Sequence, residues 1–177
     1  PFFLQEILKY NALITGLLIL PYSLTLAITA PIAGRLSGKY GSKILTRLGP
    51  ATYCIALLMF TLYDKNATMW QIILASGIMG IGNGLFQSPS NNAIMTSVDH
   101  GELGLASGIL ALARNLGNIL GVAVTITLFE TFRHLFIENG KIYETAFLYS
   151  YRTTMCFGIL FGLTCLTFAF VAYREKI

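Results

Sequence analysis

Charged residues are scarce in this chain. Only 11% of its 177 residues are Asp, Glu, Lys or Arg, whereas 55% are hydrophobic. So little polar surface cannot coat a water-soluble globule of this length. The composition therefore predicts a membrane protein, with the lipid bilayer as its first partner.

Cysteine and histidine are also rare. Cys54, Cys156 and Cys165 lie inside apolar runs without a close pair, and there are only two histidines. This pattern supports neither a disulfide framework nor a metal site, and the cysteines are read as small packing residues. The chain lacks an HExxH pair, a phosphate-cradling Gly-Lys-Ser/Thr loop and paired carboxylates inside an apolar run. We therefore expect neither an enzyme nor a cofactor.

The chain contains several long apolar runs. About 20 helical residues suffice to cross a bilayer. Five runs are long enough, and they cover about residues 11–34, 44–63, 70–98, 103–129 and 153–173. A membrane β-barrel would instead show alternating segments of about 10 residues. The predicted fold class is an all-α polytopic membrane protein with about five transmembrane helices.

Basic residues indicate the orientation. The segment 31–47 carries four cations and no acid, and Lys and Arg concentrate in cytoplasmic loops. Placing this loop inside also places the C-terminus inside, which predicts a multi-pass cell-membrane protein with a cytoplasmic C-terminus. Because the net charge of +4 is explained by topology, we expect no nucleic-acid partner.

The first ten residues, PFFLQEILKY, read as the outer end of a preceding helix plus a loop. Residues 11–177 form the predicted transmembrane bundle. We therefore expect the chain to be the C-terminal part of a larger, transporter-sized protein, with the N-terminal half of that transporter as its missing partner.

Two sets of motifs resemble a known family. The segment GRLSGKYGSK, residues 34–43, is similar to the loop signature Gly-x-Leu-x-Asp-Arg-x-Gly-Arg-Lys of the major facilitator superfamily, in its second-half copy. The order and spacing of three segments resemble the fourteen-span drug:proton antiporter (EmrB/QacA-type) branch: FLQEILKYNALITGLLILPYSL, GIMGIGNGLFQSPSNNAIM and GLASGILALARNLGNILGVAV.

The resemblance implies that the chain is the C-terminal portion of a major facilitator helical bundle, with its last five helices. It also implies an inner-loop motif made of Gly34, Arg35, Lys39, Gly41 and Lys43. Gly38 stands where the signature has Asp, so the carboxylate that helps to hold the inner gate in the family is absent here.

Arg114 is the charged residue buried inside a span. It lies about ten residues from the inner loop, hence ~15 Å deep. A cation at this depth should face a partner or a water-filled cavity rather than lipid. Two interpretations remain open, a cavity cation that contacts substrate and a structural anchor hydrogen-bonded to neighbouring helices.

Polar residues form stripes at helical spacing on three of the spans. Residues at offsets of four, seven or eleven share one helix face. The stripes are Ser107, Arg114, Asn118 and Thr125; Asn83, Gln87, Ser90 and Asn91; and, more weakly, Tyr22, Thr25 and Thr29. Interhelical hydrogen bonding would explain some of these residues. As a substrate cavity we predict Tyr22, Asn83, Gln87, Asn91, Arg114 and Asn118.

The spans 44–63 and 153–173 lack such stripes, and we expect them to face lipid outside the cavity. Glycines spaced as GxxxG predict close helix packing. Such pairs occur at Gly34 and Gly38, Gly80 and Gly84, Gly104 and Gly108, Gly117 and Gly121, and Gly158 and Gly162.

The predicted function is secondary active transport by alternating access, with proton-coupled export of drugs or other small molecules. All eight acids lie in loops or at span ends by this interpretation, so the proton site is expected in the N-terminal part. Two alternatives remain, a facilitator of another substrate class on the same fold and a non-transporting membrane anchor whose polar stripes only hold helices together.

Overall fold

The structure is a computed structural model that describes residues 2–172. A short helix, α1 (Phe2–Glu6), precedes the long helices α2 (Ala12–Tyr40), α3 (Ser42–Thr61), α4 (Met69–Met95), α5 (Leu103–Glu138) and α6 (Tyr143–Ala172), and a 3-10 turn η1 (His100–Glu102) leads into α5. Five helices are long and apolar enough to cross a membrane. The predicted all-α fold with five spans is confirmed.

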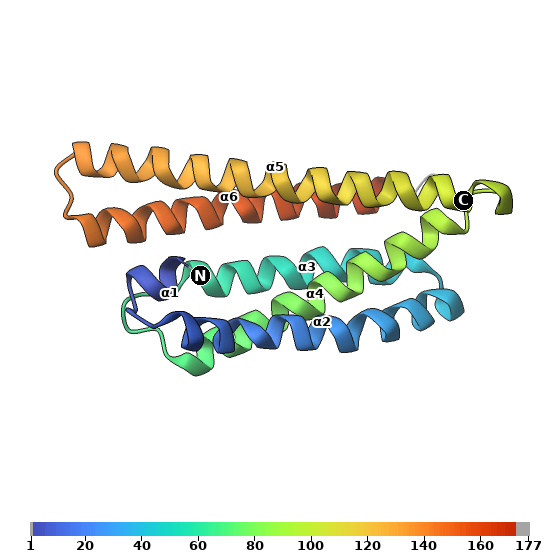
Figure 1. The fold of residues 1–177 in the computed structure, drawn as a ribbon, viewed down its shortest axis with the longest axis horizontal. Coiled ribbons are helices and arrows are strands. Elements are labelled where there is room, and N and C mark those ends of the chain that lie inside the picture. The colour runs from blue at the N-terminus through green and yellow to red at the C-terminus, as the bar shows by residue number, and fades with distance from the viewer. Residues whose placement is uncertain (1, 173–177) are drawn as a thin grey trace.

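The long helices lie in two layers (Figure 1). The helices α2, α3 and α4 form one layer, and α5 and α6 run side by side in the other. Within the first layer, α4 packs along both α2 and α3, and α3 also packs against α6. The α3–α6 contact therefore joins the layers, whereas α5 rests mainly on α6.

Glycines allow α4 to approach its two neighbours closely. A Cβ atom added at Gly80 would lie 2.2 Å from the Thr25 hydroxyl oxygen and from the Tyr22 carbonyl oxygen of α2. A Cβ atom at Gly82 would lie 2.7 Å from the backbone nitrogen of Tyr53 in α3. No side chain fits at either distance. The two glycines thus set the separation of α4 from α2 on one face and from α3 on another.

The GxxxG pairs behave differently in different helices. Gly84 also packs closely on α2, as Gly80 does, and Gly162 of α6 packs on the Cys54 sulfur of α3. The four glycines of α5 meet nothing within 4 Å in the described part of the chain, and these are Gly104, Gly108, Gly117 and Gly121. The prediction of close packing was thus correct for α4 but not for the described neighbours of α5. The GxxxG spacing does not reveal which helix face meets a neighbour.

The predicted inner loop is almost entirely helical. A single residue, Gly41, separates α2 from α3, and its φ of +83° and ψ of 155° belong to a region that only glycine adopts readily. Its N–H donates to the Ser37 carbonyl oxygen at 2.9 Å. The cations of this segment therefore lie on helix ends, with Arg35 and Lys39 on α2 and Lys43 on α3.

The helices α5 and α6 extend beyond their predicted spans. Residues 130–152 were expected to be an outer loop, but α5 continues to Glu138 and α6 begins at Tyr143. Glu130 consequently lies within a helix and pairs with Arg133 one turn later. Charges do not end a helix at a membrane surface, so charge-free runs mark the hydrocarbon-spanning part rather than the whole helix.

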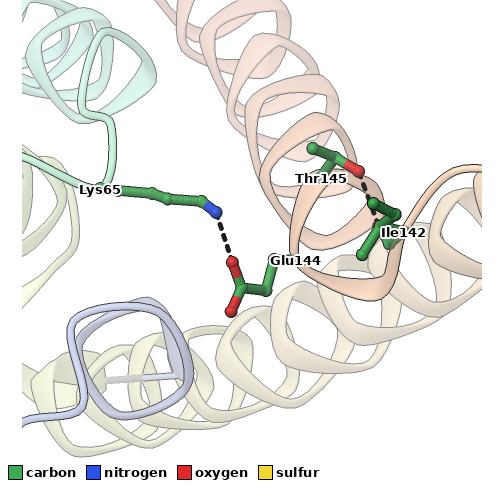
Figure 2. Close-up of polar contacts among 4 residues, drawn as sticks. All are labelled: Lys65, Ile142, Glu144 and Thr145. Carbon is green, nitrogen blue, oxygen red and sulfur yellow. Dashed lines mark hydrogen bonds and ion pairs between the residues drawn. The ribbon is translucent and has the colours of Figure 1, made fainter.

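Ion pairs connect the loop between α3 and α4 to the start of α6. Lys65 pairs with Glu144, and the Thr145 hydroxyl beside it donates to the Ile142 carbonyl oxygen at 2.7 Å (Figure 2). Arg152 of α6 pairs with Asp64 of the same loop. These side chains are largely exposed, so the pairs orient the two segments more than they stabilise them.

Candidate substrate cavity

A cavity of about 730 Å³ lies between the layers, toward the end of the molecule where α6 begins. All six helices contribute to its wall, which is mostly apolar and rich in aromatic rings. Ser76 and Met79 line it from α4, and Gly121 and Thr125 line it from α5. Tyr22 of α2 also lines it, which places one of the predicted cavity residues directly at the wall.

The polar stripes of α4 and α5 continue from this cavity toward the opposite end of the bundle. Asn83 and Gln87 follow Ser76 by seven and eleven residues, so they share its helix face. Asn118 precedes Thr125 by seven residues on α5 and shares its face in the same way. The predicted stripes thus extend the cavity-facing surfaces of two helices.

The first contact between stripes joins α2 to α4. The Asn83 side-chain amide donates to the Tyr22 hydroxyl at 2.6 Å, and both side chains are half-buried. One turn along α2, the Thr25 hydroxyl can donate its proton either to the Gly77 carbonyl oxygen of α4, at 2.9 Å, or to the Pro21 carbonyl oxygen of its own helix, at 2.8 Å. Hydrogen bonding between helices therefore accounts for part of the two stripes, as the alternative interpretation of the sequence allowed.

The second contact joins α5 to α4. The Arg114 guanidinium donates to the Asn91 side-chain oxygen at 3.2 Å. Arg114 is exposed, and α5 has no buried residue. Within residues 2–172, this amide is the one polar partner of Arg114.

Gln87 and Asn118 are the remaining members of the predicted set. Gln87 is half-buried and Asn118 is exposed. Neither side chain makes a hydrogen bond to another residue in the part of the chain that the structure describes. Their amide groups can therefore bond to water or to a bound molecule.

The second and fifth spans, which were expected to face lipid outside the substrate cavity, also contribute to the wall of this cavity. Leu57 and Phe60 of α3 line the cavity, and α6 contributes Phe147, Tyr151 and Thr154 among others. The fifth span was predicted to begin at residue 153, so the aromatic first turns of α6 were assigned to a loop. The spacing of Phe147, Tyr151 and Thr154, at four and seven residues, is the signal that would have revealed a common helix face.

The inner-loop motif residues lie far from this cavity, at the other end of α2 and α3. Gly34 faces α4, where an added Cβ atom would lie 2.7 Å from the Ser88 hydroxyl oxygen, and Arg35, Lys39 and Lys43 are exposed. A Cβ atom at Gly38 would meet nothing within 4 Å. Packing therefore does not require glycine where the signature has Asp.

Comparison with known proteins gives a match over nearly the whole chain. The family model described as Major Facilitator Superfamily matches residues 1–176. The chain is 33% identical over 122 residues to the "Multidrug resistance protein Stp" of Mycobacterium tuberculosis, covering 69% of this chain and 22% of that protein. It is 29% identical over 162 residues to the "Riboflavin transporter RibZ" of Clostridioides difficile, covering 89% of this chain and 36% of that protein.

A further relative is the "Uncharacterized transporter YebQ" of Escherichia coli, with 36% identity over 132 residues, 75% of this chain and 29% of that protein. The chain thus spans between about a fifth and about a third of the length of these curated relatives.

Proposed function

Because the chain belongs to the major facilitator superfamily, we propose that it is the C-terminal part of a transporter that exports drugs or other small molecules in exchange for protons. The relatives are transporters rather than enzymes, and several are named as multidrug resistance or drug efflux proteins. The five long helices and this family make the chain a multi-pass membrane protein. The coupling to protons and the identity of the substrate are parts of the proposal.

The observation that carries the proposal is the sparse pairing of Arg114. A cation near the middle of a span costs about 2.5–3.5 kcal/mol on insertion scales. Its single bond to the Asn91 amide offsets about 0.6–2 kcal/mol of this. The remainder must come from outside the described residues, as water, a bound molecule or a polar side chain of the other half of the transporter beside α5, and a transport pathway between two halves can supply each of these.

We propose that the rest of the transporter covers the open side of α5. This helix exposes a long apolar surface in the described part of the chain, including Leu105, Ile109, Leu112, Leu116 and Ile119. In alternating access, one half of the transporter rocks against the other around a site near the middle of the membrane. The N-terminal half is then the partner of α5, and it supplies the proton-binding carboxylate. The cations on the ends of α2 and α3 support the proposed orientation with a cytoplasmic C-terminus.

Two direct contacts between helices favour the membrane-anchor alternative. They are the Asn83–Tyr22 hydrogen bond and the bond from Thr25 to Gly77. An anchor predicts dry contacts along the whole of α4. Transport predicts a hydrated face that includes Gln87.

Single-cysteine labelling of the full-length protein separates the two functions. A cysteine at Gln87 should react with a small water-soluble thiol reagent, whereas a cysteine at Leu85, on another face of the same helix, should react slowly. A substrate should protect the cysteine at position 87. Equally low reactivity at both positions would favour the anchor over the transporter.

Proton coupling has its own measurement. In vesicles that contain the full-length protein, an imposed pH gradient should drive uptake or release of a fluorescent dye, and nigericin should abolish this by collapsing the gradient. Dye movement that ignores the pH gradient would favour a facilitator.

A further inference from the structure

The short helix α1 begins inside the bundle. Phe3 and Leu4 are each 5% exposed and belong to the hydrophobic core. The Phe3 ring stacks on Tyr151 of α6, with 4.7 Å between the ring centroids and 17° between the ring planes. Phe2 lines the cavity described above but is 66% exposed. The first turn of α1 therefore lies against the cavity wall, and a large apolar side chain at its start lacks neighbours.

The direction of α1 leads into the cavity. Figure 1 shows α1 at the end of the bundle where α6 begins, with its N-terminal end turned toward the middle. A helix that continued α1 upstream along the same axis would run between the two layers. The first four N–H groups of a helix have no acceptor within it, and in apolar surroundings they need one. Preceding helical residues would supply these acceptors.

The helices around the cavity present faces of the kind that pack on another helix. The lining residues of α5 include Val122, Thr125, Ile126 and Phe129, at offsets of three, four and seven residues. Such spacing marks one face of a helix. The lining residues of α4 and α6 follow offsets of four and seven: Ile72, Ser76 and Met79, and Phe147, Tyr151 and Thr154. In the described part of the chain α5 has no buried residue, so its face toward the cavity is uncovered.

The sequence of α1 resembles the end of a longer membrane helix. Its apolar residues come first, and Glu6 is its last residue. About 20 helical residues are needed to cross a bilayer. Since α1 has five, about 15 upstream residues would complete a span. The chain covers 22% and 36% of two curated relatives, so proteins of this kind contain more chain than the helices described here.

From these observations we infer that the segment preceding α1 in the full-length protein continues this helix across the membrane, and that the cavity between the layers is the place where that helix packs. The inference rests on the proposal that the chain is the C-terminal part of a longer transporter. Ser76 and Thr125 then contact the added helix, and the substrate contacts the polar side chains farther along α4, such as Gln87.

Disulfide cross-linking in the full-length protein tests this position. A cysteine is placed four residues upstream of Phe3, on the same helix face and about 6 Å farther along the axis. Met155 follows Tyr151 by four residues, so it lies at the matching depth on α6, and it lines the cavity. The native Cys156 has nearly the same depth but is exposed, and it is the matched control. Cys54 and Cys165 are replaced by alanine.

The upstream cysteine should form a disulfide with Met155→Cys, in a variant that also carries Cys156→Ala, when copper phenanthroline oxidises the two thiols. It should give no cross-linked product with Cys156 when Met155 is retained. A protease site inserted after Asn139 allows the chain to be cut, and a cross-link holds the two fragments together on a non-reducing gel. Absence of a product with Met155→Cys, or equal products with both partners, would overturn the inference.

A bulky side chain in the cavity gives a second measurement. Val122 lines the cavity and is 60% exposed, whereas Val124 on the same helix is 45% exposed and lies outside the cavity wall. Val122→Trp should lower the amount of folded full-length protein severalfold, because it would overpack an occupied space. Val124→Trp should not. Size-exclusion chromatography of a fluorescent fusion measures both, and equal amounts of the two variants would show that the cavity is unoccupied.

These outcomes are separate from the test of transport. If a pH gradient drives dye movement and the upstream cysteine does not react with Met155→Cys, the transport function stands and the position of the added helix is wrong. If the cross-link forms and no dye moves, the position of the helix is correct and the transport function fails.

Discussion

Replacing Gly80 by alanine tests the packing on which the whole first layer depends. The new Cβ atom would lie 2.2 Å from two oxygen atoms of α2, the Thr25 hydroxyl and the Tyr22 carbonyl. Ordinary contacts of a Cβ atom begin at 3.4 Å, so α2 and α4 would have to separate by more than 1 Å. The hydroxyl can rotate away, but the carbonyl belongs to the backbone and cannot.

Three effects determine the change in stability, and two of them destabilise the variant while the third stabilises it. Overpacking a close helix interface costs about 1–3 kcal/mol. Separation also weakens the bond from Thr25 to Gly77 across the interface, which is worth about 0.6–2 kcal/mol. Alanine in a helix regains about 0.5–1 kcal/mol relative to glycine. The net destabilisation is about 2 kcal/mol, or about thirtyfold in the unfolding equilibrium constant.

The matched control lies one turn away on the same helix. A Cβ atom at Gly77 would be 3.7 Å from the Thr25 methyl carbon, which is an ordinary contact. Gly77→Ala should therefore be neutral or slightly stabilising. Both variants of the full-length protein are compared by unfolding in sodium dodecyl sulfate, followed by circular dichroism. Equal stability of the two variants would refute the close approach of α2 and α4 at Gly80.

Three further predictions concern the ends of the helices. Cysteines at Ser42 and Asn139 of the full-length protein should label from opposite sides of the membrane, and labelling of both by an impermeant reagent from outside would overturn the topology. Gly41→Ala should destabilise the protein by about 1–3 kcal/mol, because alanine does not readily adopt the backbone angles of this residue. Gly38→Ala should not, because its added Cβ atom would meet nothing within 4 Å. The same unfolding assay compares the two variants. Glu144→Gln should leave stability unchanged within error, since exposed ion pairs contribute little, and a clear loss would show that the outer pairs hold the layers together.

Hydropathy alone was enough to predict the helices of this chain. A backbone in hydrocarbon must satisfy its own hydrogen bonds, so a long apolar run has little choice but to become a helix. For that reason the five spans were correct in number and approximate position, although the ends were not. Residues 130–152 contain enough charge to leave the membrane but nothing that stops a helix, and α5 and α6 run through most of them.

Part of the candidate site could also be predicted from the sequence. Helical spacing is sufficient to place Asn83, Gln87 and Asn91 on one face of α4. That spacing cannot show which neighbouring helix the face meets. The pairing of Asn83 with Tyr22 and of Asn91 with Arg114 depends on how α2 and α5 lie against α4.

The sequence by itself thus determined that the chain crosses the membrane as helices, because that outcome depends on local hydrophobicity and backbone hydrogen bonding. Only the tertiary structure decided which glycines are closely packed and which helices line the cavity. Gly80 and Gly117 both belong to GxxxG pairs, yet only Gly80 has a neighbouring helix within 4 Å in the described part of the chain. Likewise, α6 has no polar stripe within its predicted span, but its first turns reach the cavity because α6 packs beside both α3 and α5. Packing depends on the three-dimensional arrangement of faces that are far apart in the chain, and a repeating pattern within one helix does not contain that information.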